Sequence, residues 1–272
     1  MSNFMQRALT GIVFVVVVLG AVLWRVESIR VLITLISAMS LFEFLRLYQK
    51  KEYSVNPYFG AITAALILLV YAVFIWEYDI PVTGSLIAVS FGLLVYNLFS
   101  IKNDVFMPPG LLLIGFVYFV LPFAFLIPLI DTQDGSYNYQ LFIYLLVIVW
   151  SNDTFAYLGG KTFGKHKLMP KISPNKTIEG FVSGMLFAGL ASFLMFRFGL
   201  FSTQISWYAH VVAGVLFGTA ATVGDLIQSV VKRMAGAKDS GNLLPGHGGV
   251  WDRFDGLIAV VWIYVLFSNL FN

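Results

Sequence analysis

Long apolar segments of close to 20 residues follow one another along nearly the whole chain of 272 residues. A helix that crosses a bilayer needs about 20 apolar residues, so such segments are typical of membrane spans. Hydrophobic residues make up 59% of the sequence and charged residues 11%, whereas a soluble domain carries about 25% charged residues. We therefore predict an all-α, polytopic transmembrane protein without a soluble domain.

Turn-forming residues divide the apolar sequence into about nine predicted spans. Asn56 and Pro57 precede the third, Pro81 opens the fourth, and Pro108 and Pro109 precede the fifth. The first span is expected to be a retained helix, because no convincing small-residue cleavage site follows it. The predicted spans are residues 8–24, 28–48, 58–76, 80–100, 109–130, 139–158, 177–198, 206–228 and 253–271.

Basic residues are distributed unevenly between the two sides of this arrangement. If nine spans alternate in direction, 14 of the 17 Lys and Arg residues fall on the side of the N-terminus. The other side holds only Arg25, Arg30 and Arg197. The positive-inside rule then predicts a cytoplasmic N-terminus, an external C-terminus and a location in the cytoplasmic membrane.

The longest polar run, residues 229–255, is the C-terminal polar segment. Upstream of it, Asp225 is followed at helical spacing by Ser229, Lys232 and Arg233, so a carboxylate, a hydroxyl and two cations share one helix face. Gly236 allows the chain to leave the helix. Farther on, glycines with free N–H groups could approach an anion closely. Such a set suits nucleotidyl or phosphoryl transfer, in which positioning and charge neutralisation do most of the work.

Three carboxylates around this segment predict a metal site. Asp225 ends the predicted eighth span, and Asp252 and Asp255 begin the ninth. Antiparallel packing of those spans would bring the three together, where a Mg²⁺ ion with oxygen ligands would relieve their repulsion. The predicted metal ligands are therefore Asp225, Asp252 and Asp255. A solvated loop in which Asp252 and Asp255 pair with Arg253 and Lys238 is the alternative.

A second polar segment covers residues 150–180. Ser173 and Pro174 are expected to be the N-cap and first residue of the seventh span. Lys176, Thr177 and Glu179 would then lie at a helix N-terminus, which is a natural phosphate site. A basic loop that attracts anionic lipid headgroups is an equally valid interpretation of the spacing. Outside both segments, Glu43 is expected to be structural, with Arg46 as its partner three residues later.

The C-terminal polar segment resembles the signature of the phosphatidate cytidylyltransferase family. The similarity rests on Ser229, Lys232-Arg233, Lys238-Asp239, His247-Gly248-Gly249 and Asp252-Arg253-Phe254-Asp255. The second polar segment is similar to the family as well, through its Asn-Asp-Thr-Phe-Ala-Tyr run and its Ser-Pro-Asn-Lys-Thr-Ile-Glu-Gly run. Residues 1–140 carry no recognisable motif, so we predict N-terminal membrane helices over 1–140 and a catalytic region over 141–272, with cytoplasmic loops at 159–176 and 229–252.

The resemblance implies an enzyme that transfers CMP from CTP to phosphatidate and yields CDP-diacylglycerol and pyrophosphate. It also implies Mg²⁺, contact with membrane lipid, a homodimer and no nucleic-acid partner. The predicted catalytic residues are Asp225, Ser229, Lys232, Arg233, Lys238, Asp239, His247, Asp252, Arg253 and Asp255. The predicted substrate-binding residues are Asn152, Asp153, Ser173, Lys176, Thr177, Glu179, Gly248 and Gly249.

Two other functions are compatible with charged residues between membrane helices. A CTP-dependent polyprenol or phytol kinase would also join a lipid to a nucleotide, but it would release CDP. A secondary transporter would line a path with intramembrane charge, although here the charge gathers on one side instead of at the midplane. The sequence contains no cysteine, which excludes disulfides and thiolate metal sites.

Overall fold

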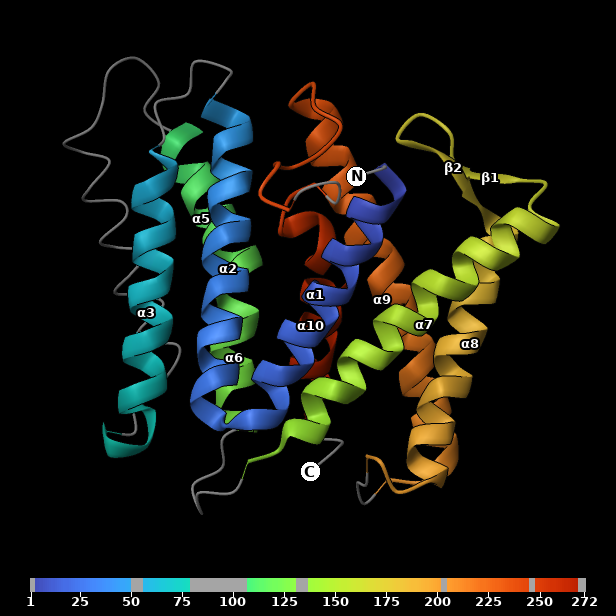
Figure 1. Ribbon diagram of the computed structural model, residues 1–272, viewed down its shortest axis with the longest axis horizontal. Helices are drawn as coiled ribbons and strands as arrows, with labels where there is room; N and C mark the ends of the chain where they lie inside the picture. Colours follow the sequence, from blue (N-terminus) through green and yellow to red (C-terminus); the bar gives the residue numbers. More distant parts are fainter. Residues whose placement is uncertain are drawn as a thin grey trace. The chain divides into compact units, whose positions relative to one another are not determined.

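The computed structural model of the chain describes residues 3–49, 56–78, 107–130, 137–201, 205–244 and 248–268. These residues are mostly helical (Figure 1). They form two compact units, which interleave along the sequence. The first unit contains residues 1–137 and 235–253, and the second contains residues 138–234 and 254–272. The predicted fourth span, 80–100, lies outside the described residues.

The first unit consists of helices that follow the predicted apolar segments. Residues near Leu41 and Phe44 in its second helix are buried, as membrane-protein packing requires. The helices of this unit are α1 (Asn3–Trp24), α2 (Val26–Gln49), α3 (Pro57–Tyr78), α5 (Met107–Phe119) and α6 (Leu121–Ile130). The break between α5 and α6 falls at Val120, because Pro122 has no N–H to continue the helical ladder.

The second unit carries the longest helices and the only sheet among the described residues. Its elements are α7 (Tyr139–Phe163), β1 (Lys167–Met169), β2 (Ser173–Thr177), α8 (Ile178–Arg197) and α9 (Trp207–Met234). Helix α10 (Trp251–Phe267) begins at the end of the first unit and continues into the second. Strands β1 and β2 are antiparallel, with Lys167 opposite Thr177.

Five described helical stretches are long and apolar enough to cross a membrane, which makes the chain a multi-pass membrane protein. They are Val26–Gln49, Gly110–Ile130, Tyr139–Phe163, Ile178–Arg197 and Trp207–Met234. Helix α1 and helix α3 contribute shorter apolar stretches. The mostly helical, membrane-type fold expected from the sequence is therefore confirmed.

The predicted cap of the seventh span, which corresponds to helix α8, was wrong. Ser173 and Pro174 do not cap a helix, because they open strand β2. The N-cap is Thr177, whose Oγ1 accepts a hydrogen bond of 3.2 Å from the N–H of Gly180. A Ser-Pro pair favours extended backbone at the serine, so it suits a strand start as well as a helix start.

Helix α7 was predicted to end at residue 158, but it continues through Gly159 and Gly160 to Phe163. These glycines, which were predicted to begin the loop at 159–176, serve close packing between helices instead. A Cβ at Gly180 of α8 would lie 2.6 Å from the carbonyl oxygen of Ala156 and 3.0 Å from the Cα of Gly160. Small residues therefore let α7 and α8 touch backbone to backbone, as small-residue seams do in membrane proteins. Figure 1 shows the two helices side by side, with the β1–β2 hairpin at one end.

Candidate active site

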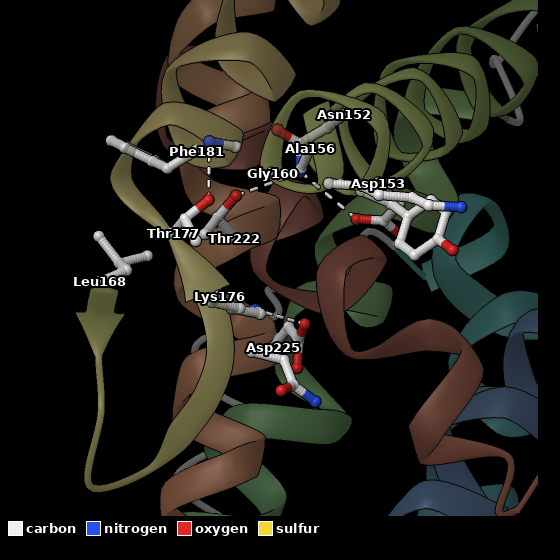
Figure 2. A pocket seen from close by; sticks show the side chains of 14 residues that line it. Asn152, Asp153, Ala156, Gly160, Leu168, Lys176, Thr177, Phe181, Thr222 and Asp225 are labelled. Atoms are coloured by element: carbon white, nitrogen blue, oxygen red, sulfur yellow. Dashed lines mark hydrogen bonds and ion pairs between the residues drawn. The ribbon is translucent and has the colours of Figure 1, made fainter. Parts of the chain in front are cut away.

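A polar pocket of about 440 Å³ opens in the second unit between α7, α8, α9 and the hairpin. Figure 2 shows its lining residues, and five of them were predicted from the sequence as site residues. These five are Asn152, Asp153, Lys176, Thr177 and Asp225. The fold thus brings the second polar segment and the Asp225 region to one cavity.

Strand β2 delivers a cation to the pocket. The ammonium group of Lys176 forms an ion pair with the carboxylate of Asp225 on α9 (Figure 2). The two side chains are 25% and 38% exposed, so both remain accessible to a ligand. The next residue, Thr177, caps α8, and the strand end therefore supplies both a charge and a helix start beside the pocket.

Helix α7 contributes a buried amide. The side chain of Asn152 is only 1% exposed. Its amide nitrogen donates to Thr222 Oγ1 at 3.2 Å and to Asp153 Oδ1 at 3.3 Å. Asn152 therefore links α7 to α9 and fixes one oxygen of the Asp153 carboxylate at the wall of the pocket.

Negative charge concentrates beside the pocket. Asp255 of α10 is partly buried, and the charges of Asp225 and Asp153 lie close enough to repel its carboxylate, while Lys232 attracts it. Gly224 permits this approach, because a Cβ there would lie 2.5 Å from the carbonyl oxygen of Asp255. Such a cluster favours a cation or a cationic partner.

Within the described ranges, no group of three or more His, Asp or Glu side chains is arranged to hold a metal ion by itself. Mg²⁺ in proteins is commonly bound by one or two carboxylates, with waters and substrate phosphates as its other ligands. Asp225 and Asp255 supply hard oxygen donors next to a pocket and repel each other without a cation. Their chemistry therefore fits Mg²⁺. The third predicted ligand, Asp252, belongs to the first unit.

The helix face that was predicted to carry Asp225, Ser229, Lys232 and Arg233 lies on α9 in the structure. Ser229 Oγ donates to Asp225 Oδ1 at 3.4 Å. Lys232 Nζ donates to Gln228 Oε1 at 2.8 Å, and Arg233 Nε donates to the carbonyl oxygen of Ile172 at 3.4 Å. The helix extends to Met234, farther than the predicted end at residue 228, and the chain then turns at Gly236, whose φ is +70°.

Two predicted substrate-binding residues of the second unit, Ser173 and Glu179, are not among the residues that line the pocket. The carboxylate of Glu179 accepts hydrogen bonds from the N–H groups of Lys165 at 3.0 Å and His166 at 3.2 Å. It also lies 2.6 Å from His166 Nδ1. Glu179 therefore holds the chain that enters the hairpin, and Ser173 begins β2.

The remaining predicted residues belong to the first unit. They lie in or directly after the polar loop, whose described parts are residues 235–244 and 248–252. Asp252 Oδ2 accepts hydrogen bonds from Ser240 N at 3.0 Å and Gly249 N at 2.9 Å, and Ser240 Oγ lies 3.0 Å from it. Gly248 has φ +85°, where glycine is favoured. Lys238, Asp239 and Arg253 are exposed, and His247 lies outside the described residues.

Sequence reasoning missed several lining residues of the pocket. Tyr157 and Lys161 follow Asp153 by four and eight residues on α7, and Thr222 precedes Asp225 by three on α9. The helical period would have found Tyr157 and Thr222 within the predicted spans, and it would have found Lys161 if the span at 139–158 had been extended to the observed end of α7. The other missed lining residues are Ala156, Gly160, Leu168, Asn175, Gly180 and Phe181.

The chain is a polytopic helical protein whose pocket combines lysines, carboxylates and a capped helix start, and these groups suit a phosphorylated ligand. Comparison with known proteins makes this specific. The sequence model of the Cytidylyltransferase family matches residues 5–271, which is almost the whole chain. The chain therefore belongs to the cytidylyltransferase family.

Individual relatives are similar over nearly their full length. A phosphatidate cytidylyltransferase of Staphylococcus aureus (strain COL) is 37% identical over 257 residues, covering 94% of this chain and 95% of the relative. One from Staphylococcus haemolyticus (strain JCSC1435) is 35% identical over 255 residues, with the same coverage. One from Bacillus subtilis (strain 168) is 33% identical over 276 residues, covering 98% of this chain and 99% of the relative.

Proposed function

We propose that the chain is a phosphatidate cytidylyltransferase, which converts CTP and phosphatidate to CDP-diacylglycerol and pyrophosphate. The observation that carries the proposal is the polar pocket with its Lys176–Asp225 pair, in a chain of the cytidylyltransferase family. A site built on membrane helices suits one lipid substrate and one soluble nucleotide. The family comparison does not favour the alternatives, a polyprenol or phytol kinase and a secondary transporter.

In the proposed reaction, a phosphate oxygen of phosphatidate attacks the α-phosphorus of CTP. A new P–O bond forms, the bond from the α-phosphorus to the oxygen that bridges to the β-phosphorus breaks, and pyrophosphate leaves with that oxygen. No strong base is needed, because an ionised phosphate is already a nucleophile. Lys176 is placed to hold phosphate oxygens in the pocket, and Lys232 and Arg233 extend the positive charge along α9.

We propose Mg²⁺ as the cofactor, with Asp225 and Asp255 of the second unit as ligands. Asp252, the third ligand predicted from the sequence, accepts hydrogen bonds from the N–H groups of Ser240 and Gly249 within the first unit. When bound, the ion offsets the charge of the triphosphate in the transition state. Asp153 adds negative charge next to these residues, and Asn152 fixes its orientation. A homodimer in the cytoplasmic membrane remains our proposal for the assembly and location of the protein.

The test of the function is pyrophosphate release by the purified full-length protein with CTP and phosphatidate. We expect CDP-diacylglycerol and pyrophosphate in equal amounts. Release of CDP with a polyprenol as acceptor would instead identify a kinase. If the protein releases neither pyrophosphate nor CDP in these assays but carries a solute into vesicles, it is a transporter.

Replacing either cation at the end of α9 should weaken catalysis. A charge-assisted contact to phosphate contributes about 1.5–3 kcal/mol, so Lys232→Ala and Arg233→Ala should each lower kcat/KM by about tenfold or more. Steady-state kinetics with varied CTP and phosphatidate will show which substrate is affected. Lys171→Ala, in the exposed turn of the hairpin, is the matched control. Near-normal kinetics in both α9 variants would show that Lys232 and Arg233 contribute to the orientation of the protein in the membrane and do not bind substrate.

We further propose about nine spans with a cytoplasmic N-terminus and an external C-terminus, supported by the bias of 14 of 17 cations. Reporter fusions at Gly164, Ser240 and Asn272 test this orientation. The first two should report a cytoplasmic position and the third an external one. An external signal at Ser240 would overturn the placement of the C-terminal polar segment in contact with cytoplasmic CTP.

A further inference from the structure

We propose that Glu43, in the N-terminal part of the chain, is a positioning residue that holds the polar loop and the start of α10. The proposal rests on the proposed function in one respect, because the loop it holds carries predicted catalytic residues. Glu43 lies on α2 and is only 1% exposed. Its expected partner Arg46 instead has its guanidinium 5.9 Å from the centre of the Phe42 ring.

Three hydrogen bonds join Glu43 to the loop. Its Oε1 accepts from the N–H of Val250 at 2.8 Å, and its Oε2 accepts from the N–H of Trp251 at 3.0 Å. Ser240 Oγ donates to Oε2 at 2.7 Å. A single carboxylate therefore joins the beginning of the loop to its end. Glu43 lies 197 residues before Ser240 and 207 residues before Val250 in the sequence.

Ser240 connects Glu43 to Asp252, which is a predicted catalytic residue. Ser240 also contacts Asp252 Oδ2 through its N–H and its hydroxyl, both at 3.0 Å. Glu43 thus fixes Ser240 on one side, and Asp252 binds it on the other. Because Val250 and Trp251 lie at the N-terminus of α10, the negative charge of Glu43 is also favourable there.

Two glycines of the loop, Gly241 and Gly249, have a physical explanation in Glu43. A Cβ at Gly241 would lie 2.6 Å from Glu43 Oε1, 2.9 Å from its Cδ and 3.2 Å from its Cγ. A Cβ at Gly249 would collide with Oε2 of the same side chain. The loop therefore closes around this carboxylate, and side chains at these two positions would push it away.

A buried carboxylate is costly unless its oxygens are well bonded. Among the described residues, Glu43 receives only the three loop hydrogen bonds, so its burial is explained by the loop and not by packing within α2. The same helix offers a control. Ser37 is fully buried and donates to the carbonyl oxygen of Phe119 at 2.7 Å, and it forms no hydrogen bond with the described part of the loop.

The first experiment reads the position of the loop without measuring activity. The chain has no cysteine, so Val250→Cys places one thiol at a site that is 7% exposed. In the full-length protein in lipid nanodiscs, this thiol should react slowly with a polar maleimide. Adding Glu43→Gln should raise the labelling rate about tenfold or more, because the side chain can no longer accept from both N–H groups. Adding Ser37→Ala should leave the rate unchanged.

The second experiment uses the collision between Gly241 and Glu43. Gly241→Ala should lower kcat/KM, since its methyl group displaces the carboxylate. Glu43→Asp, one methylene shorter, should cause a smaller loss and should partly restore the activity of Gly241→Ala. In kinetics, we expect kcat to fall more than the KM for CTP changes. Losses that simply multiply in the double variant would overturn a direct contact between the two positions.

The outcomes separate this inference from the proposed function. If wild-type protein forms no CDP-diacylglycerol, the function fails, while Val250→Cys labelling still decides whether Glu43 holds the loop. Equal labelling rates in Glu43→Gln and Ser37→Ala backgrounds would overturn the positioning role. If Glu43→Gln does not survive purification, labelling of Val250→Cys in the Gly241→Ala and Glu43→Asp backgrounds gives the same decision.

Discussion

Asp225→Asn should remove nearly all cytidylyltransferase activity, with a loss of about 100-fold or more, and any remaining activity should require more Mg²⁺. The substitution keeps the shape of the side chain and removes the charge that pairs with Lys176 and, as proposed, binds the metal. Metal-assisted charge stabilisation supplies several kcal/mol to reactions of this kind, and about 1.4 kcal/mol corresponds to tenfold. Initial rates over a Mg²⁺ titration measure both effects.

The Asp225→Asn variant should still fold and insert into the membrane. Its ion pair with Lys176 is partly exposed, and such pairs contribute only about 0–1 kcal/mol to stability. Glu27→Gln, which removes an exposed carboxylate from the first turn of α2, is the matched control and should retain normal rates. Full activity of Asp225→Asn at unchanged Mg²⁺ dependence would remove Asp225 from the site.

Lys176→Ala should lower kcat/KM by between about tenfold and 100-fold, because a charge-assisted phosphate contact contributes about 1.5–3 kcal/mol. The side chain reaches the pocket from the end of β2, where its alternation with Thr177 is fixed by the strand. Lys176→Arg should recover part of the loss, since it keeps the charge but changes the geometry. The loss should appear for CTP, phosphatidate or both in matched titrations.

The control for Lys176 is again Lys171→Ala, in the exposed turn between the strands. Both substitutions remove one positive charge from the same hairpin, so a general effect of charge on lipid attraction would reduce activity equally. Equal rates for the two variants would show that Lys176 acts only as part of a basic surface. That result would favour the alternative interpretation of the second polar segment.

The helices could be predicted because their signal is local. Runs of about 20 apolar residues placed α2, α3 and α8 close to their observed ranges, and they placed the start but not the end of α9. The hairpin was missed because the pairing of Lys167 with Thr177 depends on residues that are distant in sequence, and a Ser-Pro pair is ambiguous. The end of α7 was missed because Gly159 and Gly160 resemble a loop until α8 packs against them.

The candidate site was only partly predictable for the same reason. Motif spacing identified Asp153, Lys176 and Asp225, and the fold brings these to one pocket. Glu43 was assigned to Arg46 because a spacing of three on a helix is a reliable local rule. Its actual partners, Ser240, Val250 and Trp251, are set by tertiary packing that no spacing reveals.

The backbone contact between α7 and α8 has a consequence for how this pocket can diversify. Gly160 and Gly180 line the pocket where the helices touch, so part of its floor is bare main chain. Main-chain atoms are the same whatever the sequence, and no larger residue fits at Gly180. Variation in ligand preference among proteins with this seam is therefore expected from the side chains that line the pocket, such as Tyr157, Leu168 and Phe181, and not from this stretch of backbone.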